Sequence, residues 1–223
     1  MPRTGTANSS DSRRRCDSTG ADSPRNADSI DPVTSGARRR SLECMGTVTI
    51  SFEMTLDGAF DQMEQWFDDN DPDLVRHSDE LVFGADAVLL GRESYEFFRE
   101  YWPKQTDERG FAAHYNALPK FVASTTLTGP LDWNCTLIEG DVVDAVRGLR
   151  ERYGSIISHG YGQLAATLVD AGLVDEVHAG IHPFIVGNAE GRLRSPHPVG
   201  IRLLDVEGSE SGTIFARYAP AQR

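Results

Sequence analysis

Apolar and polar residues alternate from residue 48 to residue 56, where Val, Ile, Phe, Met and Leu are separated by Thr, Ser and Glu. A period of two is typical of a half-buried β-strand, because successive side chains point to opposite faces of a sheet. Asp57-Gly58 follows at once and predicts a turn, since both residues favour turn conformations. Further on, Asp71 and Pro72 have the order of an N-cap and a first helical residue, which predicts a helix over about 72–83.

Short apolar segments and segments of helical period alternate through the rest of the chain. Further strands are expected at 87–90, 120–124, 155–158, 176–181, 201–206 and 213–218, and further helices near 92–102, 109–117, 142–153 and 163–171. Repeated strand and helix in this order predicts a parallel sheet covered by helices. The last two strands are joined by a Gly- and Ser-rich turn, which predicts a hairpin. The expected fold class is α/β, a mixed, mostly parallel sheet flanked by helices, with a C-terminal antiparallel hairpin.

Residues 1–44 differ from the rest in composition. They contain none of the 19 aromatic residues of the chain, and their eight Arg stand against six acidic residues. With few large apolar side chains, burial cannot offset an ordering cost of about 1–2 kcal/mol per residue. We therefore expect a disordered tail over 1–44 and one domain over 45–220. Because the periodic sequence begins directly after Met45, that residue is an alternative translation start.

Charge and hydropathy narrow the range of partners. The net charge of the 223 residues is −12, which the tail and the domain divide as +2 and −14. An acidic surface repels phosphate backbones, so no nucleic-acid partner is expected. No apolar run approaches the roughly 18 residues that span a bilayer, so no membrane partner is expected either. The expected partner is a small molecule, whose anionic groups would need a local binding site, and a homodimer is left open.

The three cysteines are spaced too widely to form a recognisable site. Cys16 and Cys44 lie in the tail and Cys135 stands alone in the domain, so the sequence has neither a disulfide framework nor a zinc-ligand spacing. The first residues also lack the apolar core of a secretory signal. These features predict a cytoplasmic protein without a bound metal.

Two predicted strand-to-helix turns carry the residues best suited to bind an anion. The first contains Gly91, Arg92 and Ser94, and the second reads His159-Gly160-Tyr161-Gly162. A helix start presents free backbone N–H groups and about half a positive charge, and glycine lets a phosphate approach the backbone closely. A guanidinium and a hydroxyl at the first turn, and a titratable imidazole and a ring at the second, would add to this.

Four segments follow one another along the chain: Thr55-Leu56-Asp57-Gly58, the segment 89–96, Lys120 to Ser124, and the segment from Gly162 through 171–177 to Pro183 and Gly187. In this order they resemble the dihydrofolate-reductase-like superfamily, and most closely the reductase domain of bacterial riboflavin-biosynthesis deaminase-reductases and its stand-alone relatives. The resemblance covers roughly Met45 to Pro220. It implies a mixed α/β sheet that binds NADPH, and hydride transfer to a ribosylaminopyrimidine or a pterin-like substrate.

The resemblance also implies roles for individual residues at the cofactor. Gly91, Arg92 and Ser94 match the turn that holds cofactor phosphates. Ser124 and Thr125 match positions near the adenosine ribose and its 2′-phosphate. No acidic residue follows at the spacing with which dinucleotide-binding proteins hold a free ribose hydroxyl, so NADPH is favoured over NADH.

The second turn and the substrate pocket complete this set. Gly160 and Gly162 match a glycine-rich turn against the pyrophosphate, where the family often has three small residues. His159 and Tyr161 depart from that pattern. Asp57 lies in the Leu-Asp-Gly segment beside the substrate pocket and is the candidate for orienting or protonating the substrate ring.

Simpler structural interpretations exist for the same residues. Asp57 is suited to form a turn before glycine, and Arg92 can pair with Glu96 one helical turn later. Trp66 and Phe67 would be packing anchors or substrate-stacking groups. His178 and His182 share a strand face, but no third ligand accompanies them.

Three functions remain open from the sequence. They are an NADPH-dependent reductase acting on a ribosylaminopyrimidine or, as a dihydrofolate reductase, on a pterin; a non-catalytic NADPH-binding protein of the same fold; and an interaction module with an empty pocket. A nucleobase deaminase is excluded on this chain, because the H-x-E and P-C-x-x-C zinc signature is absent.

Overall fold

The computed structural model describes residues 45–187 and 197–221, so the tail expected over 1–44 lies outside the described residues. The strands are β1 (Thr47–Thr55), β2 (Ala87–Gly91), β3 (Lys120–Ala123), β4 (Cys135–Leu137), β5 (Ser155–His159), β6 (Glu176–His182), β7 (Ile201–Gly208) and β8 (Ile214–Pro220). The helices are α2 (Pro72–Phe83), α3 (Arg92–Tyr101), α4 (Phe111–Ala117), α5 (Val142–Arg152) and α6 (Gln163–Asp170), with short 3-10 helices η1 (Met63–Gln65) and η2 (Trp102–Lys104).

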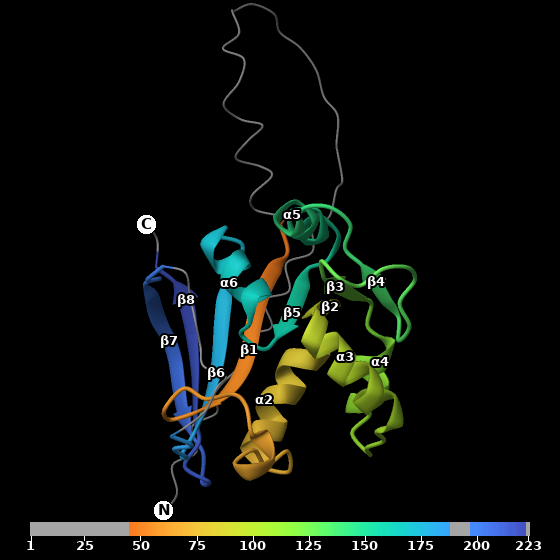
Figure 1. Cartoon of the computed structure of the whole chain (residues 1–223). Coiled ribbons are helices and arrows are strands. Elements are labelled where there is room, and N and C mark those ends of the chain that lie inside the picture. The colour runs from red at the N-terminus through yellow and green to blue at the C-terminus, as the bar shows by residue number, and fades with distance from the viewer. Residues whose placement is uncertain (1–44, 188–196, 222–223) are drawn as a thin grey trace, which may run out of the picture. The chain divides into compact units, whose positions relative to one another are not determined.

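All eight described strands form one sheet in the order β4-β3-β2-β5-β1-β6-β8-β7. In Figure 1 this sheet runs from β7 at the left edge to β4 at the right. The first six strands of that order are parallel, and β8 and β7 add antiparallel pairings. The predicted α/β class, mostly parallel sheet and C-terminal hairpin are confirmed.

Strand β4 is the element that the sequence did not predict. It has only three residues, Cys135–Leu137, and pairs with β3. It follows Trp133 and Asn134, which both have positive φ. Three residues are too few to reveal a period of two, so the strand forms because its neighbour offers an edge and not because its own pattern requires it.

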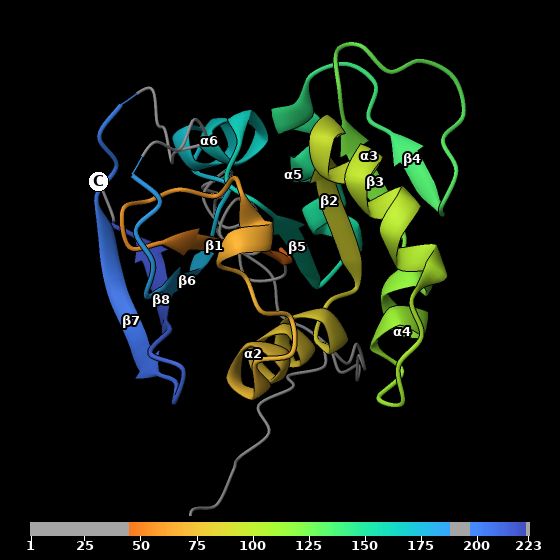
Figure 2. The ribbon, with the colours of Figure 1, turned by 60° about the horizontal axis from the view of Figure 1, so that its bottom comes forward.

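Alternation along the strands produces two cores, one on each face of the sheet, as Figure 2 shows with α5 and α6 above the sheet and α2 below it. The first core packs Val48, Ile50, Phe52 and Ile156 against Val146 and Leu149 of α5 and Ala165 and Leu168 of α6. The second packs Val88, Leu90, Val122 and Ile157 against Val82 of α2, Tyr95 of α3 and Phe111 and Tyr115 of α4. None of the described helices is long and apolar enough to cross a bilayer.

At the edge where the parallel strands begin, Arg150 of α5 joins three segments of the chain. Its guanidinium donates to the main-chain oxygen of Gly46 at 2.7 Å, to that of Leu173 at 3.3 Å and to the Asp175 carboxylate at 3.1 Å. The other oxygen of Asp175 accepts the Val48 N–H at 2.8 Å. These charge-assisted bonds fix where β1 enters the sheet.

A buried lysine lies on the β3–β4 side of the sheet. Lys120 is 0% exposed, and its ammonium donates to the main-chain oxygens of Asn116 at 3.0 Å and Leu118 at 2.8 Å. It lies 4.4 Å from the centroid of the Trp133 ring. Burial lowers the pKa of Lys120 to about 8, while burial also raises the pKa of Cys135 to about 11.

We predict that Lys120 gives the domain a pH-dependent stability between pH 8 and 10.5. In that window the unfolded chain keeps a proton that the folded chain has released, so stability rises with pH by up to about 3 kcal/mol from this group. Urea unfolding of the Cys135→Ala protein and of Cys135→Ala/Lys120→Met at both ends of the window measures it. A difference between the two proteins that stays constant with pH would contradict the prediction.

Candidate functional site

The two turns singled out in the sequence lie side by side where the parallel strands end. The Ser94 hydroxyl, in the first turn of α3, donates to the main-chain oxygen of His159 at 3.4 Å. The N–H of Gly160 donates to the main-chain oxygen of Ser51 on β1 at 2.8 Å. The starts of α3 and α6 therefore meet at the carboxyl ends of β2 and β5, and their backbone N–H groups act on the same region.

Glycine leaves room for a ligand at both helix starts. A Cβ on Gly91 or on Gly162, the N-cap residues of α3 and α6, would meet no atom within 4 Å. Neither N-cap supplies a side-chain hydrogen bond to its helix. Gly160 has φ +87°, a conformation that side chains rarely adopt. Uncapped N–H groups beside open space form a site that an anion can fill.

Arg92 lies at the start of α3 with 42% of its side chain exposed. Its guanidinium pairs with Glu96 at 2.9 Å and with Glu93 at 3.4 Å. The pairing one helical turn away, which the sequence offered as the simpler role, is therefore present. An exposed pair of this kind is worth at most about 1 kcal/mol, so a phosphate can displace it.

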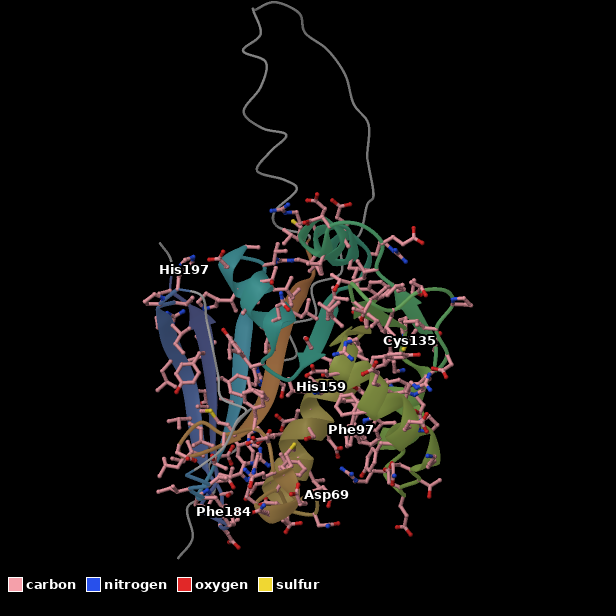
Figure 3. All side chains as sticks on the ribbon, viewed as in Figure 1. Asp69, Phe97, Cys135, His159, Phe184 and His197 are labelled. Atoms are coloured by element: carbon pink, nitrogen blue, oxygen red, sulfur yellow. The ribbon has the colours of Figure 1, made fainter. Side chains whose placement is uncertain are left out.

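His159, the titratable imidazole of the second turn, is half-buried at the end of β5. Figure 3 shows it at the end of β5, where the sheet faces α2 and α3. Its ring contacts those of Phe98 and Tyr115, with centroids 5.9 and 5.5 Å away, and its Nε2 is buried without a hydrogen-bond partner. Burial lowers the pKa of His159 to about 4.

Tyr161 points to the other face of the sheet from His159. Its ring packs edge-on against Phe52, with centroids 5.4 Å apart, among the residues of the first core. Burial raises the pKa of its hydroxyl. The ring thus packs against the sheet beside the Gly160 turn.

Ser124 and Thr125 follow directly after β3, at the same edge of the sheet. The Ser124 hydroxyl accepts the N–H groups of Thr126 at 3.1 Å and Leu127 at 3.0 Å, which shapes this turn. Thr125 is exposed. Since β3, β2 and β5 are neighbours in the sheet, the predicted cofactor residues on them lie in a row along one edge.

Asp57 connects two loops at the far end of this row. Its carboxylate accepts the Thr55 hydroxyl at 2.6 Å and the N–H groups of Val186 at 3.3 Å and Gly187 at 3.0 Å. It thereby ties the turn after β1 to the segment after β6. The turn-forming role is observed, and the carboxylate also lies at the carboxyl edge where β1 and β6 end.

A second acidic group near this edge was missed in the sequence. Glu53 of β1 and His182 of β6 are 129 residues apart, yet Glu53 Oε2 lies 2.9 Å from His182 Nε2. Trp66 and Phe67 pack around the imidazole with ring centroids 5.1 and 5.7 Å away, so the two rings are packing anchors. No local spacing signals such a pair, because strand pairing alone brings its members together.

The two histidines of β6 do not form a metal site. His178 Nε2 lies 2.8 Å from the Glu176 carboxylate, so each histidine has its own acidic partner. Among the described residues, no group of three His, Cys, Asp or Glu is arranged to hold a metal ion.

The fold and the paired glycine turns define a domain of the dihydrofolate-reductase-like type, as the sequence suggested. The chain belongs to the family of the RibD C-terminal domain, whose model matches residues 46–215. The resemblance stated from the sequence is thereby confirmed.

Known relatives are similar to the chain over most of this domain. The uncharacterized protein YyaP of Bacillus subtilis is 27% identical over 140 residues, which cover 60% of this chain and 73% of YyaP. Among solved structures, a putative riboflavin biosynthesis protein from Shewanella sp. PV-4 has a TM-score of 0.62 at 17% identity, covering 79% of this chain and 99% of that one.

A two-function enzyme shares the fold as well. The diaminohydroxyphosphoribosylaminopyrimidine deaminase/5-amino-6-(5-phosphoribosylamino)uracil reductase of Thermotoga maritima has a TM-score of 0.58 at 18% identity. The match covers 81% of this chain and 58% of that enzyme. At such identities these likenesses establish the fold.

We predict that His159 makes the domain sensitive to acid. Between pH 6.5 and 4 the unfolded chain binds a proton that the folded chain refuses, so the parent loses up to about 3 kcal/mol as the pH falls. In His159→Leu this loss disappears, which urea unfolding at the two pH values measures. His197 is exposed, so His197→Gln should show the same pH dependence of unfolding free energy as the parent. An unchanged pH dependence in His159→Leu would refute the prediction.

Proposed function

We propose that the chain is an NADPH-dependent reductase, which transfers hydride to a ribosylaminopyrimidine of riboflavin biosynthesis or to a pterin-like substrate. The observation that carries the proposal is the pair of uncapped helix starts joined by the Ser94–His159 and Gly160–Ser51 hydrogen bonds. Membership of the RibD C-terminal domain family supports it. So does the reductase named for the Thermotoga maritima enzyme of the same fold.

The residues present fit such a cofactor. The open space at Gly91 and Gly162 would admit a pyrophosphate against the backbone N–H groups of α3 and α6. Arg92, Ser94, Ser124 and Thr125 would hold the adenosine 2′-phosphate and ribose, since a guanidinium and hydroxyls suit phosphate. Bound NADPH would supply the hydride, while the protein orients the substrate and excludes water.

The proposed function is tested by cofactor titration followed by turnover. Calorimetry should find NADPH bound more tightly than NADH. Loss of NADPH absorbance should then follow on addition of 5-amino-6-(5-phosphoribosylamino)uracil or of dihydrofolate, and the faster of the two identifies the substrate class. Binding of NADPH without turnover of either substrate would favour the non-catalytic NADPH-binding protein.

We predict that Arg92→Ala weakens NADPH binding by about 1.5–3 kcal/mol, the worth of a hydrogen bond to a charged group. NADH binding should stay nearly unchanged, because NADH lacks the 2′-phosphate. Arg99→Ala is the matched control on the same helix, since Arg99 pairs with Asp132 at 3.0 Å, away from the helix start. Calorimetry measures all four affinities, and equal losses for both cofactors would show that Arg92 does not bind the 2′-phosphate.

We predict that Asp57→Asn slows turnover by about 100-fold or more, the usual contribution of a positioned acid or base, and leaves the NADPH affinity intact. Stopped-flow turnover and calorimetry measure the two effects. Since Asp57 also ties two loops together, the melting temperature is measured in parallel. Parent-level turnover in Asp57→Asn would assign this carboxylate to the loop connection alone.

A further inference from the structure

Given the proposed function, the order of strands indicates where the nicotinamide end of the cofactor would lie. The residues proposed to hold the 2′-phosphate and ribose follow β2 and β3, and those proposed to admit the pyrophosphate lie at the ends of β2 and β5. A dinucleotide laid along this row continues past β5 to the next strands, which are β1 and β6. The nicotinamide end would therefore lie at the carboxyl ends of β1 and β6, and the side chains there would face the reacting atoms.

Glu53 is the acidic side chain on β1 that faces this region from the sheet. It lies two residues beyond Ser51 on β1, and residues two apart in a strand share a face of the sheet. Because Ser51 is the residue of β1 that accepts the Gly160 N–H, Glu53 lies just beyond the Gly160 turn along β1. Its carboxylate lies on Gly180 of β6, where a Cβ would come within 1.7 Å of Oε2. One fifth of the side chain is exposed, and among the described residues Oε1 has no hydrogen-bond partner.

His182 holds this carboxylate from behind. The imidazole is buried, with Nε2 on Glu53 at 2.9 Å and Nδ1 3.4 Å from the Thr213 hydroxyl. The rings of Trp66 and Phe67 enclose it. A buried imidazole with a polar partner at each nitrogen holds its carboxylate partner in a fixed orientation.

Glu53 lines a crevice of about 30 Å³ between α2 and the sheet, which has room for a water molecule. The other charged or titratable groups that line it are His77, His178, Asp205, Glu207 and Arg217. Asp71, the N-cap of α2, also acts on His182. The pKa of Asp71 is lowered, first by a hydrogen bond from Ser211 and to a smaller degree by the charge of His182.

We propose that Glu53, held by His182, is the catalytic acid that protonates the substrate, with Oε1 as the atom that meets it, and that Asp57 orients the substrate ring. His182 is the positioning residue. This inference rests on the proposed function. It names the residue that donates the proton, whereas the proposed function names the residues that bind the cofactor.

The chemistry balances with groups that the proposal names. The hydride of NADPH forms a C–H bond at the carbon of a substrate C=N or C=O bond, and NADPH leaves as NADP⁺. The π electrons move to the nitrogen or oxygen, which takes the proton that the Glu53 carboxyl group carries on Oε1, and Glu53 is left as a carboxylate. Water in the crevice returns a proton to the pair.

The test compares Glu53→Gln with Glu176→Gln, which breaks the other carboxylate–imidazole pair of β6. Glu53→Gln should lower kcat by about 100-fold or more, leave the NADPH affinity unchanged and remove the fall of kcat with rising pH that a catalytic acid would give the parent. Glu53→Asp should restore part of the rate. Glu176→Gln should retain the rate and pH profile of the parent.

A second measurement needs no turnover. Calorimetry of dihydrofolate and of the ribosylaminopyrimidine without NADPH, in buffers of different ionisation enthalpy, counts the protons taken up on binding. Proton uptake by the parent should vanish in Glu53→Gln and persist in Glu176→Gln. Gly180→Ala keeps both members of the pair but displaces the carboxylate, so it should follow Glu53→Gln.

The outcomes separate the two levels of the proposal. If the parent binds and reduces a substrate but Glu53→Gln keeps the kcat, pH profile and proton uptake of the parent, the inference is overturned and the proposed function stands. If the parent binds neither NADPH nor either substrate, the proposed function falls and the inference falls with it. If Glu53→Gln melts well below the parent, Gly180→Ala and Glu53→Asp decide by the same criteria.

Discussion

The hydrogen bond from the Gly160 N–H to the Ser51 oxygen is the contact on which the site depends. It joins the end of β5 to the central strand β1 at the point where α6 is about to begin. The Ser94 hydroxyl then brings the start of α3 to the same turn. Both contacts are accepted by main-chain oxygens, so they do not depend on which side chains stand at positions 51 and 159. The main-chain dipoles of the two helix starts therefore act on this edge even with a residue as large as Tyr161 in the turn.

Local signals in the sequence predicted the elements that frame this edge. Alternation identified β1, and the Asp71–Pro72 pair gave the start of α2, where the Asp71 carboxylate does accept the N–H groups of Asp73 and Leu74. The glycine turns could be predicted because a glycine between a strand pattern and a helix pattern marks a turn. Each of these features depends on residues that are close in sequence.

The rest of the site depends on residues that are far apart in sequence. The Glu53–His182 pair forms only when β1 and β6 align in register, and no spacing within either strand indicates it. The low pKa of His159 depends on Phe98 of α3 and Tyr115 of α4, whose rings lie against the imidazole and come from distant parts of the sequence. Gly180 reads as an ordinary strand glycine until the carboxylate of Glu53 is seen in the space it leaves.

The hydrogen bonds of Arg150 also determine where a fusion partner or a surface linker can be attached to the domain. Arg150 holds Gly46 at the amino edge of the sheet, and β8 runs antiparallel, so that Tyr218 pairs with Val177 near the start of β6. Residues 46 and 220 therefore both lie at the edge opposite the helix starts of α3 and α6. A reporter protein fused before Gly46, or a surface linker joined after Pro220, would point away from the pocket and leave it open to solvent.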